Sequence, residues 1–258
     1  MAGGLDRREA RWLVDEFGAE GENLREAARR RRDGEPLQYV IGHWPFRSLE
    51  LDVDERALIP RPESEEMVTV ALGELLGATA LEPVIMDLGS GSGALGLALL
   101  DELRTRGVTA SLVAVDESID ALALTRQNAL KHELKNVIAV HSTWFDDVDP
   151  SLLGGVDLIV ANPPYVGEVE FLELDPVLRY EPKGAVVAPD ARGVTGFADL
   201  EIIITQAMPW LKPGGVLVCE HATTHRDAVL AAARSAGFTN VRDVDDLAGH
   251  PRVLVARR

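Results

Sequence analysis

The sequence predicts an α/β fold in which helices cover a doubly wound, mostly parallel sheet of seven strands. Beyond residue 84, apolar runs of strand length alternate with segments of helical character. This alternation is typical of successive β-α-β units, in which the strands run parallel. The chain has 258 residues, enough for one large α/β domain and a small N-terminal extension.

The N-terminal part of the sequence predicts a separate small element. Two charged stretches between residues 6 and about 32 suit short helices, and glycines near 18–21 separate them. The basic run 29–32 reads as a solvated helical face, because acidic residues share the same stretch. We therefore assign residues 1–35 to a short N-terminal helical region.

A linker follows this region. Residues 46–53 alternate apolar and polar side chains at the period of a strand. The Ile-Pro-Arg-Pro segment at 59–62 then enforces an extended, irregular connection. We assign residues 36–62 to a β-hairpin linker.

Residues 63–258 are expected to form the main domain. A helix should run from Glu63 to about Leu76, because Pro62 suits its first turn and the acidic residues that follow favour the positive end of its dipole. A short turn containing glycine and proline joins the last two apolar pieces, which predicts a closing antiparallel hairpin. The predicted strands cover residues 84–88, 111–116, 137–140, 156–161, 215–220, 240–244 and 252–256.

Composition limits the possible partners and location. The chain has 26 basic and 42 acidic residues, and the net charge of −16 disfavours non-specific binding of nucleic acid. It has no run of eighteen apolar residues and no signal peptide, and Cys219 is its only cysteine. We expect a cytoplasmic protein that binds neither membranes nor nucleic acid directly, with Cys219 as a buried structural thiol.

A glycine-rich loop follows the first strand of the main domain. Its glycines at 89, 91 and 93 let the backbone approach a ligand closely, although such a turn also occurs for tight packing of strand on helix. Asp116 ends the next strand, where a carboxylate can accept hydrogen bonds from both ribose hydroxyls or cap a helix. No lysine or arginine lies in the loop to bind a pyrophosphate, so the two features together favour an adenosyl ligand.

The sharpest motif is the tetrapeptide Asn162, Pro163, Pro164 and Tyr165, which directly follows the strand 156–161. It should lie at the carboxyl edge of the sheet, where open α/β folds bind ligands. The prolines have no N–H, so the segment offers carbonyl oxygens, and the Asn162 side chain can add another acceptor. Such a site suits the NH2 of an amide or aromatic amine, on which Tyr165 could stack. Taken alone, the tetrapeptide is equally compatible with a rigid turn.

These motifs resemble those of the HemK/PrmC family of protein-(glutamine-N5) methyltransferases, which modify the Gly-Gly-Gln motif of class-1 peptide chain release factors. The resemblance extends from about residue 30 to the end of the chain. The stretches that carry it are 30–36, 46–49, 58–63, 87–93, 162–165, 180–182 and 190–193. The Pro-Arg-Pro element together with Asn-Pro-Pro-Tyr is more specific than either motif alone.

The resemblance implies a Rossmann-like methyltransferase fold that uses S-adenosylmethionine and releases S-adenosylhomocysteine, without a metal. Phe46 and Arg61 would wall the substrate pocket, and the catalytic tetrapeptide 162–165 would hold the glutamine amide. Trp144 would lie beside the adenine, where Thr143 replaces an acid found in many relatives. From the sequence alone, Trp144 also reads as a core aromatic, and Arg61 as a partner of Glu63 or Glu65. The implied cofactor-binding residues are Asp87, Gly89, Ser90, Gly91, Ser92, Gly93, Asp116, Trp144 and Asn162.

Two alternatives were weighed against this function. A nucleic-acid adenine-N6 or cytosine-N4 methyltransferase would act on the same planar NH2, but it needs a phosphate-binding surface that an acidic chain does not favour. A non-catalytic module would not need both motifs intact. The sequence therefore predicts direct, in-line transfer of a methyl group to an amide nitrogen, with no covalent enzyme intermediate and no obligatory general base.

Overall fold

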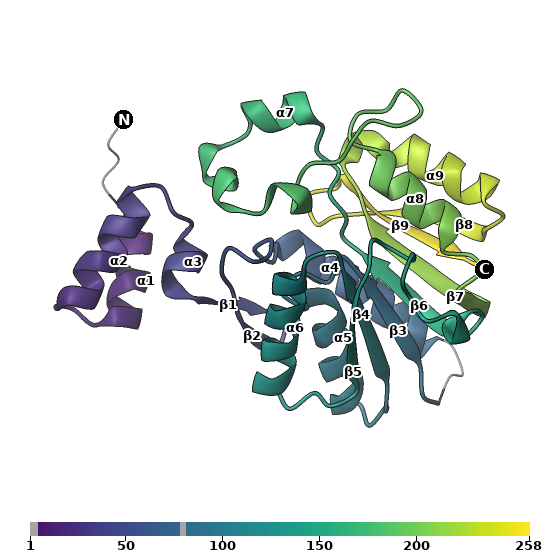
Figure 1. Cartoon of the computed structure of the whole chain (residues 1–258), viewed down its shortest axis with the longest axis horizontal. Helices are drawn as coiled ribbons and strands as arrows, with labels where there is room; N and C mark the ends of the chain where they lie inside the picture. Colours follow the sequence, from purple (N-terminus) through teal and green to yellow (C-terminus); the bar gives the residue numbers. More distant parts are fainter. Residues whose placement is uncertain (1–4, 78–80) are drawn as a thin grey trace.

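Seven strands form the central sheet of the computed structural model, which describes residues 5–77 and 81–258 (Figure 1). Five of these strands are parallel, and β9 runs antiparallel to both of its neighbours. In spatial order the strands are β5 (Val137–His141), β4 (Ser111–Asp116), β3 (Val84–Leu88), β6 (Val156–Ala161), β7 (Leu211–Glu220), β9 (Pro251–Arg257) and β8 (Thr239–Asp245). This arrangement confirms the predicted doubly wound sheet and its closing hairpin.

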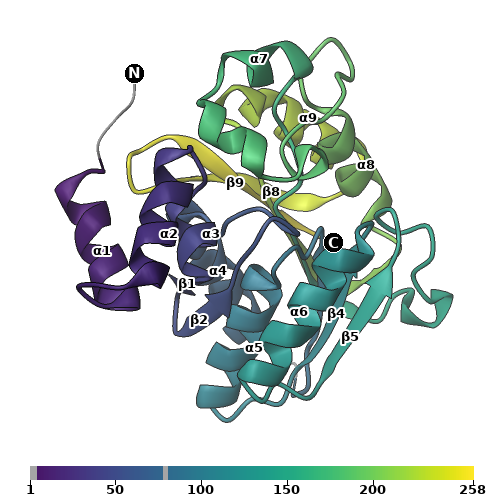
Figure 2. The ribbon, with the colours of Figure 1, turned by 60° about the vertical axis from the view of Figure 1, so that its left-hand side comes forward.

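Helices cover both faces of the sheet (Figures 1 and 2). On one face lie α4 (Pro62–Leu76), α5 (Ala94–Thr105) and α6 (Ile119–Lys131), and on the other lie α8 (Ala198–Gln206) and α9 (Arg226–Ser235). Strands covered on both sides need apolar residues at successive positions. In β3, for example, Ile85 packs into one core cluster and Met86 into the other.

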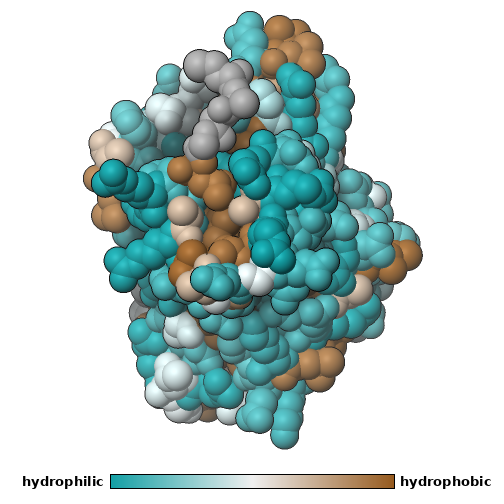
Figure 3. All heavy atoms as spheres, turned by 90° about the vertical axis from the view of Figure 1, so that its left-hand side faces the viewer, coloured by the Kyte–Doolittle hydropathy of each residue, from teal (hydrophilic) through white to brown (hydrophobic). Residues whose placement is uncertain are grey.

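The N-terminal residues form a small helical unit with its own core. Its helices are α1 (Arg7–Phe17), α2 (Glu22–Arg32) and the five-residue α3 (Leu37–Ile41), which the sequence pattern did not predict. In the basic run, Arg29 pairs with Glu26 on the same helix and Arg31 pairs with Glu9 of α1. The face of the molecule on which the N-terminal helices lie is mostly hydrophilic, with a hydrophobic strip near its middle (Figure 3). Within the described residues, no helix is both long and apolar enough to cross a membrane.

The linker forms a hairpin, and its turn interrupts the segment 46–53, which the sequence analysis described by its strand-like alternation. β1 (His43–Phe46) and β2 (Leu49–Asp52) pair so that Phe46 faces Leu49 across a two-residue turn. The turn residue Arg47 has a positive φ of 54°. The apolar–polar alternation is interrupted at this turn by two consecutive polar residues, Arg47 and Ser48, but Arg-Ser lacks the glycine or asparagine typical of such turns.

A long connection leaves the carboxyl end of β6 and leads to α8. It contains α7 (Glu168–Glu173) and single turns of 3-10 helix at Pro176–Tyr180 and Lys183–Ala185. Tyr180 donates a hydrogen bond of 3.0 Å to the carbonyl of Asp33, so this connection contacts the N-terminal unit. The connection that begins with the tetrapeptide 162–165 is therefore attached to β6 at its start and to the N-terminal unit at Tyr180.

Candidate active site

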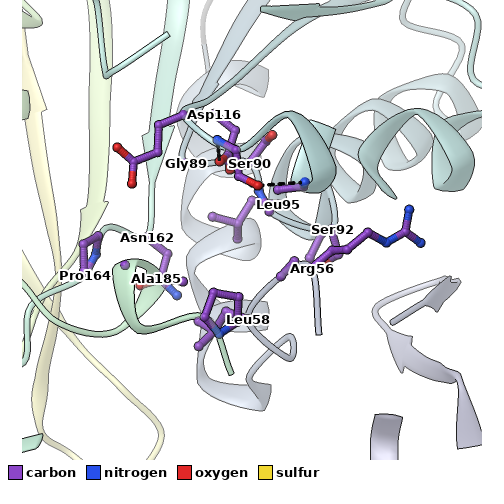
Figure 4. Close-up of a pocket in the computed structure, with 18 of the residues that line it drawn as sticks. Arg56, Leu58, Gly89, Ser90, Ser92, Leu95, Asp116, Asn162, Pro164 and Ala185 are labelled. Carbon is purple, nitrogen blue, oxygen red and sulfur yellow. Dashed lines mark hydrogen bonds between the residues drawn. The ribbon is translucent and has the colours of Figure 1, made fainter. Parts of the chain in front are cut away.

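A cavity of about 380 Å³ lies at the carboxyl ends of β3, β4 and β6 (Figure 4). Its volume is within the usual range for a small-molecule site. Residues from the glycine loop and β4 line one part of the wall, and Asn162 and Pro164 line another part. The predicted site residues that line it are Phe46, Arg61, Gly89, Ser90, Gly91, Ser92, Asp116, Trp144, Asn162 and Pro164, whereas Asp87, Gly93, Pro163 and Tyr165 lie outside its lining.

The glycine loop is shaped by backbone conformations that other residues rarely adopt. Gly91 has a φ of 55° and donates its N–H to Asp116 Oδ2 at 2.8 Å. Gly93 has a φ of 84° where α5 begins, and a Cβ there would lie only 2.7 Å from Leu97 Cδ1. The glycines thus bring the backbone to the cavity wall and let α5 start directly behind it.

Asp116 is fixed by two backbone donors. Its Oδ2 accepts from Gly91, and its Oδ1 accepts from the N–H of Ser118 at 2.9 Å. Burial raises the pKa of Asp116 above its ordinary value, although these two hydrogen bonds oppose the shift. Each oxygen keeps a second lone pair, so the carboxylate can still accept from a diol. The alternative role as helix cap is wrong, because Ser118 caps α6.

Asp87 lies behind the glycine loop and is only 1% exposed. Its Oδ2 accepts from the N–H of Gly96 at 2.9 Å, and Oδ1 has no hydrogen-bond partner among the described residues. Burial raises the pKa of this carboxyl to about 7. Asp87 therefore holds the first turn of α5 behind the loop, instead of forming the cavity wall.

Trp144 lines the cavity beside the glycine loop. A Cβ at Gly89 would lie 3.5 Å from its ring, and its Nε1 donates to Asp199 Oδ1 at 3.0 Å. Asp199 and Thr143 line the same cavity. Sequence reasoning missed Asp199, which lies at the start of α8, 55 positions after Trp144, and belongs to no motif.

Asn162 is held by a residue that the sequence did not indicate. Its Nδ2 donates to the hydroxyl of Ser64 in α4 at 3.2 Å, and Ser64 donates to Glu220 Oε2 at 2.7 Å. Tyr165 donates from its hydroxyl to Glu220 Oε1 at 3.1 Å. The only signal that could have drawn attention to Glu220 is an acidic residue at the end of an apolar strand.

Arg61 pairs with a buried acid far along the chain. Its Nη2 lies 2.6 Å from Glu181 Oε1, and Glu181 Oε2 accepts from the N–H of Ile59 at 2.9 Å. The expected alternative partners, Glu63 and Glu65, are therefore not the ones that Arg61 contacts. The pair ties the Pro-Arg-Pro segment to the connection after β6.

The wall of the cavity fits an uncharged or positively charged adenosyl ligand better than a phosphate. Arg56 also lines the cavity, but its guanidinium binds Asp54 at 2.6 Å, as that of Arg61 binds Glu181. The fixed carboxylate of Asp116 and the free backbone of the glycine loop offer acceptors and close contact instead. Across residues 5–77 and 81–258, no cluster of three or more His, Cys, Asp or Glu residues could hold a metal ion.

Relatives of similar sequence identify the family of this chain. The release factor glutamine methyltransferase of Vibrio cholerae is 38% identical over 229 residues, which cover 88% of this chain and 75% of the relative. The chain belongs to the release factor glutamine methyltransferase family. The family member of Salmonella typhimurium is 39% identical over 92% of this chain and 80% of its own length. The Bifidobacterium longum member is 34% identical over 99% of this chain and 88% of its own length. The resemblance noted from the motifs is thereby confirmed.

The fold is that of S-adenosylmethionine-dependent methyltransferases. Residues 68–173 match the model of the methyltransferase small domain. A methyltransferase of Pyrococcus furiosus superposes with a TM-score of 0.56 at 15% identity, over 81% of this chain and 88% of that chain. A 16S rRNA methyltransferase of T. thermophilus, solved with AdoMet and guanosine, gives 0.55 at 19% identity, over 84% of this chain and 49% of that one. At such identities these two structures support the fold alone.

Proposed function

We propose that this protein transfers a methyl group from S-adenosylmethionine to the side-chain N5 of a glutamine, in the Gly-Gly-Gln motif of class-1 peptide chain release factors. The observation that carries the proposal is the orientation of Asn162. Its NH2 group donates to Ser64, so its carbonyl oxygen remains as the acceptor beside two prolines that have no N–H. The names of the family members supply the protein substrate.

The acceptors at residues 162–164 would hold the two amide hydrogens of the glutamine. An amide nitrogen is a poor nucleophile because its lone pair is delocalised into the carbonyl group. Acceptors that grip both hydrogens orient the nitrogen, favour its pyramidal geometry and stabilise the positive charge that develops on it. Water can remove the extra proton afterwards, so no residue needs to act as a base.

S-adenosylmethionine supplies a methyl group bonded to a positively charged sulfur and leaves as S-adenosylhomocysteine. Asp116 would bind its ribose hydroxyls, the loop 89–93 would lie along it, and Trp144 would contact its adenine. Asp87 would contribute indirectly, by holding the backbone behind the glycine loop in place. Phe46 and Arg61 would wall the part of the cavity that receives the glutamine, because both line the same cavity as Asn162.

Methylation of a nucleic-acid base is not favoured. The net charge is −16, and the two arginines that line the cavity, Arg56 and Arg61, are each paired with a carboxylate. A phosphate backbone would find no free cation among these wall residues. We also propose a division of the chain into the N-terminal helical region 1–35, the linker 36–62 and the catalytic domain 63–258. The linker packs against its neighbours on both sides, since α3 shares the core of the N-terminal helices and the hairpin shares that of α4 and α5. We further propose that the protein works in the cytoplasm.

Label transfer tests the proposed substrate. The purified protein is incubated with isotopically labelled S-adenosylmethionine and a class-1 release factor, and the labelled residue is located by mass spectrometry. The matched control is the same release factor with alanine in place of the glutamine of Gly-Gly-Gln, and a DNA duplex is a third sample. We expect label on that glutamine alone. Label in adenine or cytosine, or equal label on the alanine control, would contradict the proposal.

A further inference from the structure

A buried carboxyl group outside the cavity connects the two ends of the tetrapeptide 162–165. Glu220 is the last residue of β7, is 2% exposed and does not line the cavity. Its Oε1 accepts from the hydroxyl of Tyr165, and its Oε2 accepts from the hydroxyl of Ser64, which in turn accepts from Asn162. One carboxyl group thus contacts Tyr165 directly and reaches Asn162 through Ser64.

In the structure, the hydroxyl groups of Ser64 and Tyr165 both donate to Glu220. An ionised carboxylate only accepts, so both hydroxyl groups must donate to it. Burial, to which nearby Glu63 adds, raises the pKa of Glu220 above its ordinary value, although the two donated hydrogen bonds and the charge of Arg252 oppose this shift. The direction of both bonds therefore holds for the ionised form of Glu220. Ser64 has a single hydroxyl hydrogen, and it is used on Glu220.

The consequence for Asn162 follows from the chemistry of Ser64. With its hydrogen committed to Glu220, the Ser64 oxygen can only accept from a third group. Asn162 must therefore turn its NH2 toward Ser64 and its carbonyl oxygen away from it. Without this direction, the two ends of the Asn162 amide are nearly equal in shape, and either could face the cavity.

We propose that Glu220, acting through Ser64, is the positioning residue that sets which end of the Asn162 amide faces the cavity. This inference rests on the proposed function, since an amide acceptor needs the carbonyl end. With the opposite orientation, Asn162 would present a donor to the donor hydrogens of glutamine and would hold them no longer. Glu220 itself touches neither substrate nor cofactor.

The first test examines the orientation in the free protein and needs no substrate. The side-chain NH2 signal of Asn162 is identified in a nitrogen–proton NMR spectrum by its loss in Asn162→Ala. We expect Ser64→Ala and Glu220→Gln to move this signal, because each changes the partner or the direction of the bond. The matched control is Ser48→Ala, which removes a serine that donates to buried Asp101 at 2.7 Å, away from the cavity. An Asn162 signal that is unchanged in Ser64→Ala would overturn the inference.

The second test is kinetic and asks whether Ser64 acts through Asn162. We expect Ser64→Ala to lower kcat for release-factor methylation about tenfold to a hundredfold, less than loss of the oriented acceptor itself. Its affinity for S-adenosylmethionine should stay within about twofold of wild type, a difference of less than 0.5 kcal/mol by the usual conversion. In an Asn162→Ala background, Ser64→Ala should cause no further loss of kcat, because the residue it positions is gone.

The outcomes of the two tests separate this inference from the proposed function. If wild type methylates the release factor but Ser64→Ala keeps full kcat, or lowers it equally in both backgrounds, the positioning role is wrong and the function stands. If wild type does not methylate the release factor, the proposed function fails, and the NMR comparison still decides the orientation of Asn162.

Discussion

Arg61 and Glu181 form an ion pair across 120 positions of the chain, with 2.6 Å between Arg61 Nη2 and Glu181 Oε1. The Glu181 side chain is 2% exposed and that of Arg61 is 32% exposed. The pair joins the segment before α4 to the connection after β6, and both segments line the cavity. The shape of the cavity thus depends on a contact between its two sides.

Removal of Arg61 should destabilise the protein more than its surface position suggests. Arg61→Ala leaves the Glu181 carboxylate buried with one backbone donor, from Ile59. We expect a loss of unfolding free energy near the lower end of the range of about 3–5 kcal/mol for broken buried pairs, since Arg61 is partly exposed. Denaturation in urea measures the change.

The control for this prediction is Arg56→Ala. Arg56 also lines the cavity, but both members of its pair with Asp54 are about one-third exposed, at 29% and 34%. Its removal should cost less than about 1 kcal/mol. Equal losses of unfolding free energy in Arg61→Ala and Arg56→Ala would mean that burial of Glu181 does not increase the cost of breaking its ion pair.

Asp116→Asn should weaken cofactor binding selectively. The amide keeps the shape of the carboxylate, but one of its ends cannot accept from the N–H of Gly91 or Ser118 or from a ribose hydroxyl. Hydrogen bonds to a charged acceptor contribute about 1.5–3 kcal/mol, so we expect the Kd for S-adenosylmethionine to rise about 10- to 100-fold. Isothermal titration calorimetry checks this, with Asp120→Asn on the exposed first turn of α6 as control. A Kd equal in both variants would rule out the assigned role.

Asp87 should make stability depend on pH in the absence of cofactor. Its native pKa of about 7 lies above the ordinary value of 3.8, so the native state binds this proton more tightly than the unfolded chain. The resulting stabilisation is complete below about pH 4 and is lost as pH rises toward about 7, at up to about 1.4 kcal/mol per pH unit. Asp87→Asn, which cannot ionise, should lack this loss.

The pH prediction is tested by urea unfolding of both proteins between about pH 5 and about pH 8. The stability of wild type relative to Asp87→Asn should fall across this interval and level off above it. If the unfolding free energies of wild type and Asp87→Asn differed by the same amount at every pH, burial would not shift the titration of Asp87.

Most of the main domain follows from short-range patterns in the sequence. The strands predicted at 84–88, 111–116 and 156–161 are those of the structure, because helices on both faces require unbroken apolar runs there. β7 begins at Leu211 instead of 215, through a Lys-Pro-Gly-Gly segment that lacks strand character. The turn at Arg47 lacks the usual glycine or asparagine, and α3, although Pro36 precedes it and Gly42 ends it, has only five residues, too few for a helical period to show in the sequence.

The residues that hold the site residues in place could not be predicted, because they make contact across distant parts of the chain. Asn162 and Ser64 are 98 positions apart, and Ser64 and Glu220 are 156 positions apart. Ser64 in a helix and Glu220 at a strand end belong to no recognisable pattern. Motifs identify the residues that face a ligand, whereas only the packing of α4 against β6 and β7 identifies the residues that hold them in place.

The central claim is that the Asn162 carbonyl holds a planar nitrogen for methylation, and single-turnover methylation of a release factor by Asn162→Ala tests it most directly. Loss of a preorganised acceptor predicts a rate about 10²- to 10³-fold below wild type, with unchanged affinity for S-adenosylmethionine. Asn136→Ala, which removes an asparagine bonded to the carbonyl of Ala110 away from the cavity, should keep the wild-type rate. A near-normal rate in Asn162→Ala would contradict the account.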